Sequence, residues 1–205
     1  MTVTVAIPTS DPTNFSKEDF NALKNSLQYC VPHIRFYNLT SEEFADEYPI
    51  KTEITDEIKN TYKFKLLLHG SRDGFTYKKF HEICDNQSRT VTIIKVKVSK
   101  EILGGYNPIE WKSDDSYGTT KDSFIFSFKR CNDIKSYILS RIKNEKVAIL
   151  NSFDRGPSFG ISDFILDGDF GKCGNFTYEK QISETTDLFS DLFSVEEYEV
   201  FQITR

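Results

Sequence analysis

Residues 65–111 decide the fold of this chain, and they read KLLLHGSRDGFTYKKFHEICDNQSRTVTIIKVKVSKEILGGYNPIEW. Apolar side chains at residues 62, 64, 66 and 68 alternate with lysines at residues 63 and 65, a pattern that predicts a half-buried strand. Residues 69–74 include two glycines and are expected to form a turn. Asp73 is placed to accept the first backbone N–H bonds of a helix over residues 74–84. The stretch therefore begins as strand, turn and short helix.

The second half of the stretch predicts a pair of strands. Residues 90–98 carry Thr, Ile and Val on one face and lysines on the other, which is the clearest strand pattern in the chain. Ser99-Lys100 provides a tight connection to a strand over residues 101–106. Gly104-Gly105 inside that strand indicates a bulge or a close backbone approach. Trp111 is expected to fill one end of the core.

The remaining sequence is also rich in short strands. Phe124, Phe126 and Phe128 share one face of a strand over residues 122–129, and isoleucines spaced by four predict a helix over residues 133–143. With about seven strands and few helices, the pattern favours an α+β fold, an antiparallel β-sandwich with short peripheral helices, over a βαβ fold. Also expected are strands at 147–150, 161–166, 175–179 and 198–203, a turn at 156–160, and loops at 112–121 and 167–174.

The first part of the chain differs in composition from the rest. Residues 1–61 are expected to form an acidic, partly helical extension that begins with a tail-like segment, and residues 62–205 the main domain. Capping patterns and apolar spacing predict helices from Ser16 to about Cys30 and from Thr40. The extension is too small and too polar to hold a core by itself.

Charge and cysteine usage restrict the classes of partner and compartment. The net charge of −5 argues against nucleic acid as the main partner. Residues 61–178 carry 19 Lys/Arg and 14 Asp/Glu, which is either a docking surface for an acidic partner or simply solvated surface. No apolar run is long enough for membrane insertion. Four scattered cysteines, no CxxC pair and a start unlike a signal peptide predict free thiols in the cytoplasm.

His81 and Cys84 are the only candidates for catalysis, three residues apart on the expected helix. They provide two ligands of a metal site, for which no familiar spacing supplies the others. They are also a candidate nucleophile and base, with Asp85 or Glu82 as the third group. The alternative is a buried Cys84 and a His81 that bonds to a turn. No cofactor and no metal are expected.

The glycine-bounded turn at residues 70–74 has two interpretations. In the first interpretation it binds a phosphate at a helix N-terminus with the help of Arg72. The turn lacks the Walker spacing and the G-x-G-x-x-G pattern, however, and Asp73 would repel an anion. In the second interpretation the glycines supply positive φ, Asp73 caps the helix and Arg72 pairs with a carboxylate such as Asp85. The second interpretation is favoured.

Taken in order, these pieces resemble the TLDc domain family over roughly residues 62–204. Residues 20–44 resemble the helical end of a BACK segment, as in BTB–BACK–TLDc proteins. The motifs that carry the TLDc resemblance are residues 66–70, Ser71-Arg72-Asp73-Gly74-Phe75, Phe80-His81 with Cys84-Asp85, residues 92–96, Gly104-Gly105-Tyr106, Trp111, residues 123–128, Gly156-Pro157 with Phe159-Gly160, and residues 197–201.

The resemblance implies a function as well as a fold. The family has a β-sandwich with two helices and no accepted reaction; its members are associated with resistance to oxidative stress, and several bind the peripheral sector of the vacuolar proton-pumping ATPase. It therefore implies a non-enzymatic interaction module. The alternatives are the recognition part of a BTB-type cullin ubiquitin-ligase adaptor, whose BTB domain would bind the cullin, and an enzyme that uses Cys84 and His81. The residues expected to contact a partner are Ser71, Arg72, Asp73, Gly74, His81, Asp85, Gly104, Gly105, Tyr106 and Trp111.

Overall fold

The computed structural model describes residues 5–6, 61–128, 137–183 and 192–204. The chain divides into two units, Met1–Lys63 with Arg205, and Phe64–Thr204, and we describe each by itself. In the first unit, β1 (Val5–Ala6) pairs antiparallel with Thr61 and Tyr62. The tail-like start predicted from the sequence thus contains a short strand. The helices predicted between residues 16 and 60 lie outside the described residues, and the boundary at residue 62 stays a prediction.

The second unit is an antiparallel β-sandwich with short helices, as the sequence predicts. One sheet has the order β12-β3-β4-β6-β7 and the other the order β5-β8-β9-β10-β11-β12. The strands are β2 (Thr61–His69), β3 (Thr90–Val96), β4 (Ile102–Asn107), β5 (Ser116–Gly118), β6 (Phe124–Phe128), β7 (Tyr137–Arg141), β8 (Ile149–Asn151), β9 (Ser158–Phe159), β10 (Phe164–Asp167), β11 (Phe170–Cys173) and β12 (Phe193–Thr204), and the helices are α3 (Gly70–Asp73), α4 (Tyr77–Cys84) and the 3₁₀ helix η3 (Glu145–Val147).

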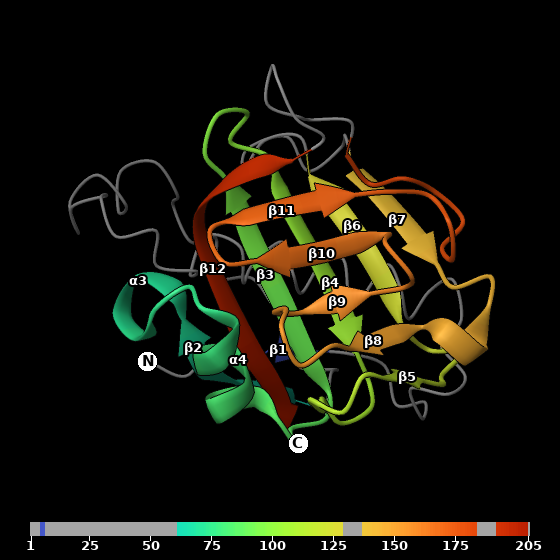
Figure 1. The fold of residues 1–205 in the computed structure, drawn as a ribbon, viewed down its shortest axis with the longest axis horizontal. Coiled ribbons are helices and arrows are strands. Elements are labelled where there is room, and N and C mark those ends of the chain that lie inside the picture. Colours follow the sequence, from blue (N-terminus) through green and yellow to red (C-terminus); the bar gives the residue numbers. More distant parts are fainter. Residues whose placement is uncertain (1–4, 7–60, 129–136, 184–191, 205) are drawn as a thin grey trace. The chain divides into compact units, whose positions relative to one another are not determined.

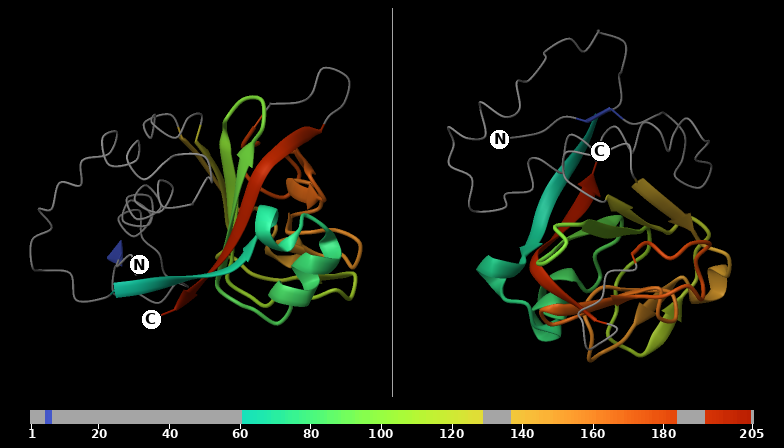
Figure 2. Two further views of the ribbon diagram at one scale, coloured as in Figure 1. Left: turned by 90° about the vertical axis from the view of Figure 1, so that its left-hand side faces the viewer. Right: turned by 90° about the horizontal axis from the view of Figure 1, so that it is seen from above.

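Strand β12 belongs to both sheets. Its first residues, Phe193 and Ser194, pair with β11, and the strand then continues alongside β3 from Val195 to Gln202. Strand β2 also pairs with β12. Figure 1 shows β9, β10 and β11 crossing in front of β3, β4 and β6, with β12 curving along the side of both layers. The edge-on view in Figure 2 separates the two layers, with α4 beside them.

The core fills the space between the two sheets and beneath α4. Aromatic rings dominate it: Trp111 lies edge-on against both Phe80 of α4 and Phe159 of β9, and its indole N–H donates to the Thr90 hydroxyl at 2.7 Å. The bonded N–H explains how a tryptophan is accommodated at full burial. The core therefore joins the helix, the first sheet and the second sheet around one side chain.

Two predicted elements are wrong, and both concern the chain after β6. Residues 137–141 form strand β7, paired with β6, rather than part of a helix. Isoleucines spaced by four also fall on one face of a strand, so the spacing alone does not separate the two periods. Residues 175–179 contain only an isolated bridge between Tyr178 and Ile142 instead of a strand.

Other differences are added or shifted strands. The predicted loop at 112–121 contains β5, the turn at 156–160 contains β9, and the glycine-rich loop at 167–174 contains β11, which follows a turn at Gly168 with φ of 63°. These strands have two to four residues, a length at which turn-forming residues at the ends mask the strand pattern.

Gly104 and Gly105 are required for a close approach, one of the two alternatives predicted from the sequence. Strand β4 keeps a regular register with both β3 and β6, so it contains no bulge. A Cβ at Gly105 would lie 2.5 Å from the ring of Phe159, and one at Gly104 would collide with Phe126. The glycines thus let aromatic rings from two other strands rest directly on the β4 backbone.

We expect Gly105→Ala to lower the free energy of unfolding by about 1–3 kcal/mol, the usual cost of overpacking a core. The measurement is chemical denaturation of the whole chain. In a Phe159→Leu background the cost of Gly105→Ala should shrink, because the smaller side chain leaves the ring position open. Equal costs in the two backgrounds would contradict the assignment of Phe159 as the obstructing ring.

Candidate functional site

The turn after β2 is a single helical turn, α3, closed by a glycine. The Gly74 N–H donates to the Gly70 carbonyl at 2.8 Å, and Gly74 has a φ of 105°, a value that L side chains rarely adopt. Asp73 accepts the His69 N–H at 2.9 Å and so ties the two ends of the turn together. The predicted cap is thus assigned to the wrong residue: Thr76 is the N-cap of α4 and accepts from the Lys79 N–H. The helix begins at Tyr77 for that reason.

Arg72 is the charged residue that this turn presents to solvent. Its guanidinium donates to both oxygens of Asp73, at 2.8 and 2.6 Å, and its side chain remains 56% exposed. The hydrogen bond from Arg72 lowers the pKa of the Asp73 carboxyl. Arg72 therefore pairs with its neighbour and not with Asp85, which the sequence suggested.

Three buried ionisable side chains lie behind the turn. His69 of β2 is 6% exposed, and Glu197 and Glu199 of β12 are 7% and 1% exposed. Atom Nε2 of His69 lies 3.2 Å from Oε1 of Glu199, and atom Nδ1 lies 3.6 Å from Oε2 of Glu197 and 3.1 Å from the Ser71 hydroxyl. Two carboxylates therefore flank one imidazole in a place from which water is largely excluded. We call His69, Glu197 and Glu199 the acid cluster.

Glu197 connects the acid cluster to the turn. Its Oε1 accepts the backbone N–H of Ser71 at 3.0 Å and that of Tyr198 at 2.9 Å. Gly70 packs directly on it, because a Cβ at Gly70 would lie 2.7 Å from the same oxygen. The position of the exposed Ser71-Arg72 pair is thus set from below by a buried carboxylate.

Glu199 is the most unusual member of the acid cluster. Among the described residues its Oε2 has no hydrogen-bond partner, although the atom is buried. Burial and the neighbouring Glu197 raise the pKa of Glu199 to about 8. A buried, half-bonded carboxylate is costly when ionised, so Glu199 carries a proton at neutral pH.

Ser71, His69 and Glu199 contact one another in the order of a serine–histidine–acid catalytic triad, but their protonation and exposure differ from those of such a triad. The acid of such a triad must be ionised to stabilise an imidazolium, whereas Glu199 is protonated at neutral pH. Ser71 lines neither the surface groove beside β5 nor the one over β10 and β11. The two carboxylates also face opposite nitrogens of His69, so they do not converge on one metal ion.

His81 lies in a second polar cluster, apart from the turn. It is bonded at both nitrogens: Nδ1 lies 2.8 Å from Asp85 Oδ1 and Nε2 lies 2.9 Å from the Arg155 carbonyl. The other oxygen of Asp85 accepts the Ser113 hydroxyl at 2.8 Å. The bond to Arg155 attaches α4 to the loop between β8 and β9. A His81 bonded to a turn was the alternative to a catalytic role in the sequence analysis.

Cys84 is fully buried in the core, and its thiol is free, as is that of Cys173; Cys30 and Cys131 lie outside the described residues. Burial raises the pKa of the Cys84 thiol far above its usual range, with a smaller contribution from Asp85. A thiol that stays protonated is a poor nucleophile. Since both nitrogens of His81 are bonded elsewhere, the geometry offers no activated pair.

The structure separates the remaining predicted contact residues. Ser71, Arg72, Asp73 and Gly74 lie together in the turn, and His81 and Asp85 lie in the second polar cluster. The other four, Gly104, Gly105, Tyr106 and Trp111, are buried within the sandwich, where Tyr106 stacks on Phe124 and Trp111 packs against Phe159 and bonds to Thr90.

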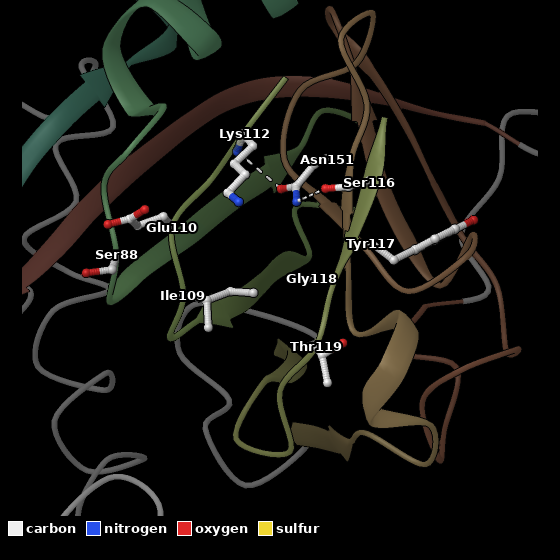
Figure 3. A pocket seen from close by; sticks show the side chains of 9 residues that line it. All are labelled: Ser88, Ile109, Glu110, Lys112, Ser116, Tyr117, Gly118, Thr119 and Asn151. Carbon is white, nitrogen blue, oxygen red and sulfur yellow. Dashed lines mark hydrogen bonds between the residues drawn. The ribbon is translucent and has the colours of Figure 1, made fainter. Parts of the chain in front are cut away.

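An open groove of about 470 Å³ lies beside strand β5 (Figure 3). It runs between β5 and the segment that follows β4, where Glu110 and Lys112 carry opposite charges. Asn151 joins its two sides, because it accepts the Lys112 N–H at 3.2 Å and donates to the Ser116 hydroxyl at 3.1 Å. None of the residues singled out from the sequence lines this groove. A second groove, of about 410 Å³, lies over β10 and β11.

Sequence reasoning missed the acid cluster. The signal was the spacing of Glu197 and Glu199, two residues apart on one face of a strand whose other residues are largely apolar. Two acids on a strand face that becomes buried violate the usual rule for cores, and such violations mark candidate functional sites. That the face becomes buried was not visible in the sequence.

Within the described ranges, no group of three or more His, Cys, Asp or Glu is placed to hold a metal ion. No helix in the described part of the chain is long and apolar enough to cross a bilayer.

The fold and the site together define a β-sandwich module with a structured, charged surface turn. The sequence model of the TLDc domain matches residues 38–204, which is more than half of the chain. The chain therefore belongs to the TLDc domain family. The match begins before residue 62, within the segment assigned from the sequence to the extension. A comparison with curated proteins gives no match. The BACK-like character of residues 20–44 stays a prediction.

We expect stability to fall as the pH rises towards 8, through Glu199. Its pKa is 4.5 in an unfolded chain and about 8 in the fold, so between these values the folded state holds the extra proton. Stability due to this proton is fully present below about pH 4.5 and is lost as the pH rises through about 8. Glu199→Gln, which is neutral at every pH, should flatten this decline in thermal unfolding curves.

Glu196→Gln is the matched control on the same strand. Although burial opposes the shift, hydrogen bonds from Lys100 and Lys95 lower the pKa of Glu196, so its contribution is lost only under acidic conditions. The variant should shift the whole curve above neutral pH without changing its slope. A slope that Glu199→Gln leaves unchanged would contradict the assignment to Glu199.

We expect Cys84 to resist alkylation in the native protein. Burial keeps the thiol protonated, so iodoacetamide near pH 8 should modify it only after unfolding. Peptide mass spectrometry resolves each cysteine separately, with Cys84 in denaturant as the positive control. Rapid native modification of Cys84 would contradict its placement in the core.

Proposed function

We propose that this chain is a non-enzymatic, protein-binding regulatory module linked to oxidative-stress resistance, and that it binds the peripheral sector of the vacuolar proton-pumping ATPase. Membership of the TLDc family supports the general role. The link to the ATPase comes from the resemblance to family members that bind it.

The observation that carries the proposal is the turn at residues 70–74. It presents Arg72 and Ser71 to solvent, and a buried glutamate fixes its backbone from below. A surface element held by buried bonds loses little freedom on binding, which favours protein recognition. Arg72 also keeps donors free for a partner, since its two bonds to Asp73 use only part of its five.

The chemistry of the cysteines and histidines supports a binding role over an enzymatic one. Cys84 is buried and protonated, His81 is bonded at both nitrogens, and the Ser71-His69 contact lacks an ionised acid. The cullin-adaptor alternative rests on residues 20–44, which lie outside the described residues, so no described contact favours it.

We expect the 205-residue chain to capture the isolated peripheral sector of a vacuolar ATPase at low salt, less so at moderate salt, and Arg72→Ala to weaken capture several-fold. The reason is the loss of the exposed cation of the turn, whose attraction salt screens. Lys146→Ala, which removes an exposed cation at η3, is the control and should bind as the unaltered chain does.

No capture by the folded protein at either salt concentration would overturn the ATPase proposal. Equal losses for Arg72→Ala and Lys146→Ala would instead show that overall charge, and not the turn, is responsible.

A further inference from the structure

Among the described residues, no lysine or arginine forms an ion pair with Glu197 or Glu199 of the acid cluster. With both carboxyl groups ionised, Glu197 and Glu199 would place two negative charges around the His69 ring. Arg72 is the cation of α3, but its guanidinium binds Asp73. Lys95 of β3 lies opposite Glu197 in the sheet, but its ammonium binds Glu196. Tyr198 between the two glutamates adds no positive charge.

The second oxygen of Glu199 independently disfavours the ionised form of this side chain. An ionised carboxylate accepts bonds at both oxygens, yet among the described residues only Oε1 has a partner, the imidazole at 3.2 Å. A buried acceptor left empty costs about 1–3 kcal/mol, and more when charged. Protonation of Glu199 removes the additional cost that the charge brings.

We propose that His69, Glu197 and Glu199 form a proton-binding site, here called the lock, that holds the 70–74 turn in one conformation. The exposed Ser71-Arg72 surface of the turn is ordered when this site holds its proton and becomes mobile when the proton is lost.

The link between proton and turn runs through Glu197. When Glu199 ionises, it repels the carboxylate of Glu197, which lies on the same side of β12 and contacts the same imidazole. Glu197 has little room to move, because its Oε1 holds the Ser71 and Tyr198 amides and packs against Gly70. Displacement of Glu197 therefore releases the Ser71 amide, the bond that fixes the exposed part of the turn.

His69 transmits the same change to the other end of the turn. Its backbone N–H binds Asp73 at 2.9 Å, and its Nδ1 contacts the Ser71 hydroxyl at 3.1 Å. Rearrangement of the imidazole between the two glutamates thus alters both contacts. Asp73 stays paired with Arg72 throughout, since its pKa is held low by that bond.

The first test uses the protein alone. Backbone amide shifts of Ser71, Gly74 and Tyr198, and the ring carbons of His69, are followed by NMR from about pH 6 to about pH 9.5, a range that brackets the Glu199 titration. We expect all four to report one transition with a shared midpoint. His81→Gln, which removes the histidine of the other polar cluster, should leave the transition in place, and Glu199→Gln should abolish it.

Two outcomes would overturn the lock. One is the absence of a pH transition at the Ser71 and Tyr198 amides of the unaltered chain, a result that does not depend on any variant folding. The other is a transition that survives Glu199→Gln in a folded protein.

The second test concerns docking and rests on the proposed function. Capture of the isolated ATPase sector is compared at about pH 6.5 and about pH 8.5, on either side of the Glu199 titration. We expect capture to fall several-fold at the higher pH for the unaltered chain and to change less for Glu199→Gln, which also controls for titration of the ATPase itself. No capture at any pH would end the proposed function but leave the NMR result to decide the lock. Equal pH dependence of capture in the two chains would overturn the role of the lock in docking.

Discussion

Strand β12 is the constraint on which the rest of this structure depends. It pairs with β11 at its start and with β3 along most of its length, so it holds the two sheets of the sandwich together. Tyr198 and Val200 contribute to the core between the sheets. Glu197 and Glu199 occupy the opposite side of the same strand and are buried as well. At Glu197 and Glu199 the strand is covered on both sides, so these two acids must be satisfied by neighbours or by protons.

The candidate site is the place where that requirement is met. His69 ends β2 between the two glutamates, and Glu197 holds the amide of Ser71 in the turn that follows. Buried ionisable groups seldom add net stability, and replacing them with apolar residues is often neutral or favourable. Their presence beneath an exposed arginine is therefore best explained by the surface that they position. In contrast, His81 and Cys84 have the surroundings of structural residues.

Much of the fold could be predicted from the sequence, because strong local patterns survive in the structure. The alternation over residues 90–98 became β3, and the prediction of an antiparallel sandwich with short helices is confirmed. The failures share a physical reason. Residues 137–141 form β7 because β6 offers a partner edge, although the isoleucines spaced by four over residues 133–143 fit a helix equally well. The helix cap at Thr76 instead of Asp73 followed from Asp73 being engaged by His69 and Arg72.

The sequence by itself determined the class of fold, the family and the turn at residues 70–74, since all of these depend on local periodicity, glycines and an ordered set of motifs. Only the tertiary structure decided which residues act together. It buried Gly104, Gly105, Tyr106 and Trp111, and it brought Glu197 and Glu199 to His69 across more than half of the chain. The physical reason is that burial and proton affinity are properties of surroundings: a glutamate on a strand is an ordinary surface residue until another strand and a turn cover it.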